Sequence, residues 1–182
     1  WRHPRRASDP PRQPARIPRV ASWPERHART RVPRYTPAWQ EARRDKAPGS
    51  LACLRAAFDL VGAPRSLLDV GCGLGHLVEW AQAKGVDALG VDLSHADDTG
   101  LLRHADLREP LRLERTFDLV TCWEVAEHLP EAAADTICDS LVRHLTPGGL
   151  LLFTAAPPGQ GGDGHLNEQP PAYWRQRLEA RG

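Results

Sequence analysis

The fold is decided by the stretch Leu67-Leu68-Asp69-Val70-Gly71-Cys72-Gly73-Leu74-Gly75. Its apolar first half is typical of a buried parallel strand. The three alternating glycines have no Cβ atoms, so they predict a turn in which the backbone can adopt left-handed angles and lie directly against a bound molecule. The stretch therefore predicts a site for a nucleotide-like ligand at the end of a strand.

The glycine spacing separates two kinds of ligand. The dinucleotide fingerprint G-x-G-x-x-G needs its third glycine where His76 stands, so NAD is disfavoured. Asp69 followed by G-x-G-x-G resembles the first motif of class I S-adenosylmethionine-dependent methyltransferases. The resemblance implies that Asp69 helps to position the amino group of the cofactor, directly or through water. It also implies that the turn passes beneath the methionine part of the cofactor, with the candidate contacts Gly71, Cys72, Gly73 and Gly75. The alternative is a plain glycine-rich turn between a strand and a helix.

The segments that follow match a βαβ unit. An apolar stripe over residues 77–81 predicts a helix that ends at Lys84-Gly85. A second strand over 86–91 is closed by Asp92, about 20 residues beyond the glycine turn, where an acid can accept both ribose hydroxyls. A weaker third strand covers 101–107, and its Asp106 matches the family's acid for the adenine amino group, although an ordinary loop carboxylate is the alternative. Leu93 and Leu107, which directly follow these two acids, are also expected to contact the cofactor.

The fourth strand is expected over residues 117–122 and leads into Trp123-Glu124-Val125-Ala126-Glu127-His128. Ligands of open α/β sheets bind beyond the carboxyl ends of the strands, so Cys122 and Trp123 are expected at the cofactor. A helix from about Glu131 to Leu145, stopped by Pro147-Gly148-Gly149, should precede a fifth strand over 150–154. The L-T-P-G-G-x-L-L-x-T phrase of residues 145–154 again resembles the methyltransferases, and the resemblance covers roughly residues 50 to 175.

These elements predict a three-layer αβα, Rossmann-like sheet with the strand order 3-2-1-4-5 in residues 49–182. In the family two more strands follow, and they are missing here, so we expect a domain that is incomplete at its C-terminus. The fifth strand would then be an exposed apolar edge.

Charge is distributed unevenly along the chain. Residues 1–48 hold 12 Arg and one Lys against four acids, a net charge of +9, and nine of the 17 prolines, whereas the remainder carries −8. Such a segment is expected to be a disordered arm. It could bind nucleic acid, act as a targeting peptide, or be foreign to the native domain, and we favour the last, also because the chain lacks methionine. Without a long apolar run, a cytoplasmic location is expected and no membrane contact.

The four cysteines, Cys53, Cys72, Cys122 and Cys138, have no C-x-x-C spacing. Neither a zinc site nor a disulfide framework is indicated. Cys72 and Cys122 could approach the cofactor, but small polarizable filler is the favoured role.

The phrase Glu124-x-x-Glu127-His128 leaves three interpretations open. On one helical face, these side chains could hold a divalent ion. A similar E-x-x-E-H phrase binds magnesium in small-RNA 3′-terminal 2′-O-methyltransferases, and a related one occurs in ubiquinone-pathway O-methyltransferases. We expect no metal, and instead expect His128 as general base with Glu127 fixing its tautomer. Loop structure is the third interpretation.

The glycine-rich stretch 159–171 is expected to be a substrate loop over the site. Its G-H-x-N-E-Q phrase is similar to that of bacterial methyltransferases of glycan or small-metabolite pathways. This makes His165 a candidate catalytic residue and Asn167 and Glu168 candidate acceptor contacts. The alternative is that Asn167 and Glu168 cap a helix near Pro171.

We therefore expect methyl transfer from S-adenosylmethionine to a small-molecule or glycan-precursor acceptor. The alternatives are a metal-assisted RNA or quinone-type O-methyltransferase, and a non-catalytic scaffold whose basic arm binds nucleic acid. The cofactor half of the site does not distinguish carbon, oxygen and nitrogen acceptors.

Overall fold

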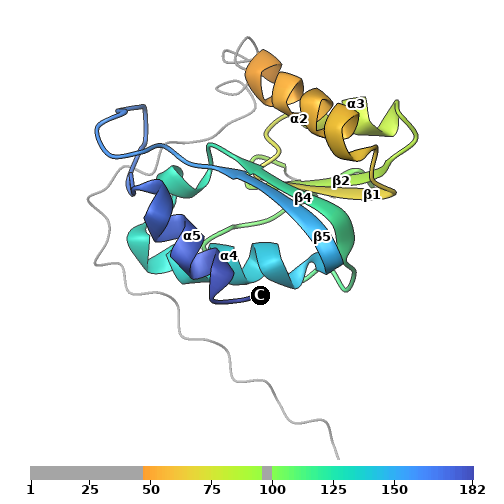
Figure 1. Ribbon diagram of the computed structural model, residues 1–182. Helices are drawn as coiled ribbons and strands as arrows, with labels where there is room; N and C mark the ends of the chain where they lie inside the picture. Colours follow the sequence, from red (N-terminus) through yellow and green to blue (C-terminus); the bar gives the residue numbers. More distant parts are fainter. Residues whose placement is uncertain (1–46, 96–99) are drawn as a thin grey trace, which may run out of the picture. The chain divides into compact units, whose positions relative to one another are not determined.

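The computed structural model describes residues 47–95 and 100–182. Within them, five parallel strands form one sheet with the order β3-β2-β1-β4-β5 (Figure 1). This is the order expected from the sequence. The strands are β1 (Ser66–Val70), β2 (Asp87–Asp92), β3 (Leu102–His104), β4 (Phe117–Trp123) and β5 (Leu145–Thr154).

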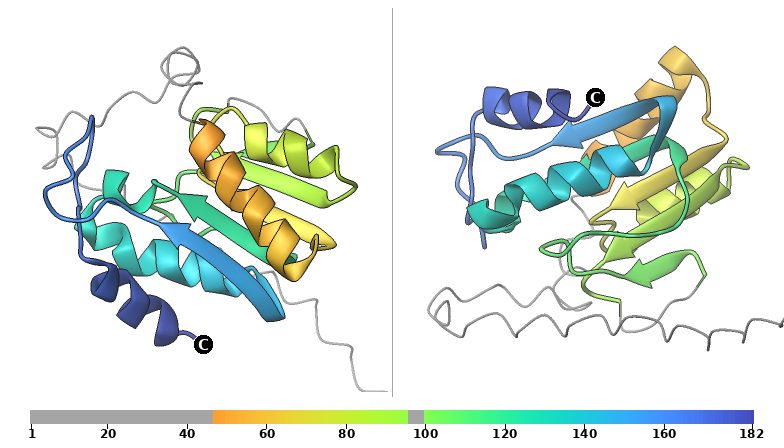
Figure 2. Two further views of the ribbon diagram at one scale, coloured as in Figure 1. Left: turned by 45° about the horizontal axis from the view of Figure 1, so that its top comes forward. Right: turned by 90° about the horizontal axis from the view of Figure 1, so that it is seen from below.

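Helices cover both faces of this sheet, which gives the three expected layers (Figure 2). One face carries α2 (Ala47–Val61) and α3 (His76–Gln82). The other carries α4 (Ala134–Arg143) and α5 (Pro171–Glu179), and two short 3₁₀ turns, η3 (Ala126–His128) and η4 (Glu131–Ala133), lead from β4 into α4. In the ranges that the structure describes, none of the helices is long and apolar enough to cross a membrane.

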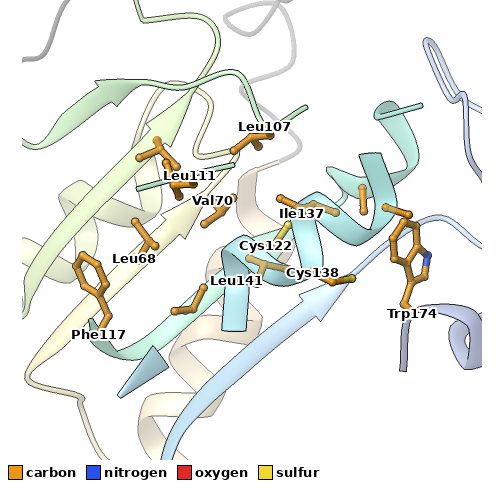
Figure 3. Close-up of a cluster of buried hydrophobic side chains, with 14 of the residues drawn as sticks. Leu68, Val70, Leu107, Leu111, Phe117, Cys122, Ile137, Cys138, Leu141 and Trp174 are labelled. Carbon is orange, nitrogen blue, oxygen red and sulfur yellow. The ribbon is translucent and has the colours of Figure 1, made fainter. Parts of the chain in front are cut away.

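Alternate residues of the central strands fill two separate cores, because both faces of the sheet are covered. Leu68 pairs with Leu89 of β2 and with Val120 of β4, and all three contribute to the core beneath α4. Ten members of that core are labelled in Figure 3: Leu68, Val70, Leu107, Leu111, Phe117, Cys122, Ile137, Cys138, Leu141 and Trp174. Beneath α2 and α3, Leu67 and Leu119 pack with buried residues of the two helices, among them Leu54 and Val78.

The boundary between the fourth helix and the fifth strand was predicted wrongly. The helix ends at Arg143 instead of Leu145, and β5 begins at Leu145, five residues before the predicted start. Phe117 pairs with Leu145 and Leu119 with Leu150, so Pro147-Gly148-Gly149 forms an irregularity inside the strand and not the end of a helix. Gly148 has a φ of +77°, which a glycine adopts without strain.

The third strand is shorter than the predicted 101–107. It ends at His104, and the carboxylate of Asp106 accepts a hydrogen bond from the backbone N–H of Arg108 at 3.0 Å, which closes a turn after the strand. Asp106 therefore lies in the loop beyond β3. The predicted disordered arm falls on residues 1–46 outside the described part of the chain, except for its last two residues, where α2 begins.

Candidate functional site

The glycine turn follows β1 with the backbone that the sequence predicts. Gly71, Gly73 and Gly75 have φ values of +79°, +55° and +85°, all in the region that favours glycine. A Cβ at Gly71 would lie 2.3 Å from Cγ2 of Val125, and a Cβ at Gly75 would lie 2.7 Å from Cδ2 of Leu102. Packing within the chain therefore requires glycine at two of these positions, in addition to any need of a ligand.

Asp92, at the end of β2, is fixed against this turn. Its Oδ2 accepts a hydrogen bond from the backbone N–H of Gly73 at 3.0 Å, and its Oδ1 accepts one from Ser94 at 2.8 Å. The carboxylate thus joins the ends of β1 and β2, where a ligand of a parallel sheet binds. Leu93, the next residue, is 39% exposed beside it.

Asp69 of β1 is a buried carboxyl group, only 2% exposed. The hydroxyl of Thr121 on β4 donates a hydrogen bond to its Oδ1 at 2.7 Å. Burial raises the pKa of Asp69 to about 7. The hydrogen bond from Thr121 lowers this pKa, and the negative charge of Asp92 raises it further. The group therefore sits close to the balance between its neutral and its charged form at neutral pH.

Asp106 is held by its own loop. The guanidinium of Arg108 contacts both carboxylate oxygens, at 2.8 Å and 3.0 Å from Nε, and these hydrogen bonds hold the pKa of Asp106 below its usual value. Leu107 is buried in the core beneath α4. The adenine contact predicted for this loop stays a prediction.

The cysteine and tryptophan at the end of β4 are placed differently from each other. Cys122 is fully buried in the core beneath α4, so only its backbone can face a cofactor. Trp123 points to the other face and packs against the core beneath α2 and α3. In the glycine turn, Cys72 lies with its Sγ 3.6 Å from Nε2 of His95, and burial keeps the pKa of this thiol well above its ordinary value.

The E-x-x-E-H phrase does not form one helical face, as the metal interpretation had assumed. Glu124 has a φ of +52°, and only Ala126–His128 forms a 3₁₀ turn, η3. Glu124 is exposed, and its Oε2 accepts a hydrogen bond from Nε2 of Gln160 at 3.3 Å. Glu124 does not belong to the group of potential metal ligands that Glu127, His128 and His165 form, although its charge acts on the pKa of Glu127 and His128.

Glu127 is fully buried, and neither carboxylate oxygen has a hydrogen-bond partner among the described residues. Burial raises its pKa to about 7. The backbone amides of Glu127 and Ala156 lower it without reaching hydrogen-bonding geometry, the charge of Glu124 raises it, and His165 lowers it. A buried carboxyl group without partners costs free energy, so this is a position where a bound group would compensate.

His128 and His165 meet beside Glu127. Their rings pack edge to face with centroids 4.8 Å apart, and one ligand atom from each of Glu127, His128 and His165 lies within 4.8 Å of the others. Nδ1 of His128 donates to the carbonyl of Gly164 at 3.2 Å, so Nε2 bears the lone pair. The prediction that Glu127 fixes this tautomer is wrong, because the carbonyl of Gly164 does so. Burial lowers the pKa of His128, which favours the neutral imidazole.

The substrate loop is closed on itself by Glu168. Its carboxylate accepts hydrogen bonds from the backbone of Gly159 and Gly161, both at 2.8 Å, and from Nδ1 of His165 at 2.7 Å. The N-cap of α5 is Pro170 without a side-chain hydrogen bond. The alternative in which Asn167 and Glu168 cap this helix is therefore wrong.

The loop is also tied to η3 through the backbone. The carbonyl of Glu127 accepts hydrogen bonds from Leu166 at 2.7 Å and from Asn167 at 3.0 Å. The sequence did not predict this contact. It also did not predict the contact of His128 with the carbonyl of Gly164 or the hydrogen bond from Thr121 to Asp69. Backbone carbonyls leave no trace in residue types, but Thr121 is a polar residue within the apolar run Leu119–Trp123 of the strand and could have been noticed.

Known proteins resemble this chain along most of its length. The family model described as a methyltransferase domain matches residues 27–182. A ubiquinone biosynthesis O-methyltransferase from Psychrobacter cryohalolentis is 32% identical over 126 residues, which are 61% of this chain and 44% of that protein. The chain thus spans about half the length of the curated relatives it matches.

Two solved structures share the arrangement of the sheet. CalS10 with bound S-adenosylmethionine, an amino pentose methyltransferase from Micromonospora echinaspora, is 28% identical with a TM-score of 0.50, covering 72% of this chain and 64% of its own. A methyltransferase dependent on S-adenosylmethionine from Archaeoglobus fulgidus has a TM-score of 0.57 at 18% identity, covering 73% and 67%.

Proposed function

This chain belongs to the class I methyltransferases that use S-adenosylmethionine, and on that premise we propose that it methylates a hydroxyl group of a small molecule. The observation that carries the proposal is the meeting of His128 and His165 at the end of the sheet that also holds the glycine turn and Asp92. A hydroxyl acceptor needs a general base, and a neutral imidazole is suited to that task. The curated relatives are named O-methyltransferases, which supports the same class of acceptor.

The cofactor side fits S-adenosylmethionine on the geometry of this chain. Gly71, Gly73 and Gly75 have positive φ angles and no side chains, and the carboxyl groups of Asp69 and Asp92 lie near the ends of two adjacent strands. Asp92 would hold the ribose hydroxyls and Asp69 the amino group, as the resemblance implies. The bound cofactor supplies an activated methyl group on its sulfonium.

The acceptor side is assigned to His128. Its Nδ1 proton is engaged by Gly164, so Nε2 is the atom that takes the proton of the acceptor hydroxyl. His165, whose Nδ1 proton is directed to Glu168, would orient the acceptor beside it. The protein otherwise contributes positioning, which is most of what an in-line methyl transfer needs.

The first test is calorimetric titration of S-adenosylhomocysteine into the full chain, with Asp92→Ala and an NADH titration as controls. We expect binding that is lost in the variant and absent with NADH. Transfer is then measured with labelled S-adenosylmethionine and three probes: protocatechuate, UDP-glucose and an oligouridylate. His128→Ala should lower turnover about 100-fold or more with cofactor affinity near that of the wild type. A folded sample that binds no S-adenosylhomocysteine would refute the proposal.

A second candidate, metal-assisted methyl transfer, is favoured by the orphaned carboxylate of Glu127. With His128 and His165 it would offer one carboxylate and two imidazoles to a divalent ion. This donor set suits manganese, zinc or other transition ions better than magnesium, which prefers oxygen ligands. The ion would polarise an acceptor hydroxyl and lower its pKa.

The metal candidate is tested without activity. Mn²⁺ or Zn²⁺ alone is titrated into protein treated with a chelator, alongside His165→Ala and Glu124→Ala. Binding that is lost in the first variant and kept in the second would support the Glu127, His128 and His165 set. Wild-type protein that binds neither ion would leave His128 as the base.

A further inference from the structure

Asp69 forms a buried pair with Thr121, a residue to which the family resemblance assigns no role. They are register partners on the adjacent strands β1 and β4, and the hydroxyl of Thr121 lies 2.7 Å from Oδ1 of Asp69. Thr121 is fully buried and Asp69 is 2% exposed. Thr121 also lies 3.4 Å from the carbonyl of Leu68, a longer and weaker contact. The short contact therefore directs the hydroxyl proton at the carboxyl group.

The surroundings of Asp69 disfavour its negative charge. The titratable groups that interact with it are Asp92 from β2, Cys72 from the glycine turn and Cys122 from β4, none of which is a cation. Helices α2 and α3 contribute apolar side chains to this side of the sheet, among them Leu54 and Val78. Within the described residues, no cationic side chain pairs with Asp69. The described residues therefore leave this carboxylate without a compensating positive charge, which a bound cation would supply.

We propose that Asp69 and Thr121 together form a proton-linked receptor for the ammonium group of the cofactor, in which Thr121 is the positioning residue. The inference rests on the proposed function, because the amino acid part of the cofactor is the cation that reaches Asp69. On binding, the O–H bond of the Asp69 carboxylic acid breaks and its proton passes to the buffer. The carboxylate that remains pairs with the ammonium and keeps the hydrogen bond from Thr121.

A definite pH dependence follows from this arrangement. Because the pKa of Asp69 is raised to about 7, the free protein holds the proton below that pH and must release it to bind. Affinity should therefore fall about tenfold for each pH unit below about 7 and be level above it. Removing the hydroxyl of Thr121 makes the carboxylate harder to form, so the level region should begin at a higher pH.

The experiment is calorimetric titration of S-adenosylhomocysteine into the full chain from about pH 6 to about pH 8. Each pH is measured in two buffers with different heats of ionisation, which counts the protons released. The variants are Thr121→Val and, as the conservative replacement, Thr121→Ser. Thr146→Val is the matched control, because Thr146 makes a similar contact to Asp118, at 3.4 Å, near the opposite ends of the strands.

For the wild type we expect close to one proton released near pH 6 and almost none near pH 8. Thr121→Val should bind about tenfold more weakly near pH 7, with its profile moved to higher pH, while Thr121→Ser and Thr146→Val follow the wild type. Affinity independent of pH, or Thr121→Val equal to the wild type, would overturn the inference. If Thr121→Val fails to fold, the proton count of the wild type decides alone. Absence of binding at every pH would instead refute the proposed function.

Discussion

Replacing Asp69 by asparagine separates the stability cost of this buried acid from its role in binding. Asparagine has nearly the same shape but does not ionise. In the unfolded wild type the carboxyl group has its ordinary pKa of 3.8, and burial raises it to about 7 in the folded protein. Between these values the folded protein holds a proton that the unfolded chain has lost. The stabilisation that the neutral acid provides is full below the lower pKa and is lost as the pH rises through the upper one.

The magnitude follows from the two values. The difference between these pKa values corresponds to about 4 kcal/mol in total, of which roughly 2 to 3 kcal/mol falls between pH 5 and pH 8. The free energy of unfolding of Asp69→Asn should therefore rise relative to the wild type by roughly that amount over this interval. Glu127, whose pKa is also raised to about 7, is present in both proteins, so its contribution cancels in the difference.

The assay is urea denaturation of both proteins at several pH values, each with its own wild-type reference. A constant offset between the two proteins is acceptable, because the amide and the carboxyl group differ in hydrogen bonding. The reasoning would be refuted by a difference that does not change with pH. The same variant should also lose S-adenosylhomocysteine binding, which the cofactor assignment requires.

Three further outcomes are expected. Gly71→Ala should lower the free energy of unfolding, measured by urea denaturation, by roughly 2 to 4 kcal/mol, since it adds a positive-φ penalty to a clash with Val125. The second substitution Val125→Ala should restore part of this free energy in the Gly71→Ala protein. Asp92→Ala should weaken the binding of S-adenosylhomocysteine about 100-fold, and it should also lower the melting temperature because the backbone amides of Gly73 and Ser94 lose their acceptor; a binding constant like that of the wild type would remove Asp92 from the site. Glu168→Ala should make the loop over 159–168 more susceptible to limited proteolysis while cofactor affinity stays unchanged. Glu168→Gln should be cleaved more slowly than the alanine variant, because it keeps an acceptor oxygen for one glycine amide. Equal cleavage of the wild type and both variants would contradict the role of Glu168 in closing the loop.

The cofactor half of the fold was predictable from sequence because its determinants are local. Alternating glycines, an apolar strand before them and acids at strand ends are visible in residue types, and the strand order and three layers were predicted correctly. The boundary at 143–150 was predicted wrongly because Pro147-Gly148-Gly149 is compatible both with a helix stop and with a break inside a strand. Pairing with β4 decided between them, and pairing is not a local property.

The acceptor half was less predictable because its contacts join distant segments through the backbone. The tautomer of His128 depends on the carbonyl of Gly164, 36 residues away, and Glu168 acts on two glycine amides instead of on a helix. The structure brings together His128 and His165, two of the candidates named from the sequence, and their catalytic roles stay a prediction. Their partners could not be identified, because backbone groups are the same in every residue.

The carbonyl of Glu127, shared by the amides of Leu166 and Asn167, bears on how new acceptor specificities can arise in this domain. The turn at 126–128 and the loop at 159–168 are inherited as separate stretches of the gene, yet each holds the other in shape. A recombinant that takes only one of them from a relative would join two backbones that did not evolve together. Exchange of both stretches at once preserves the two hydrogen bonds, so a test of the proposed acceptor role by recombination should move them together.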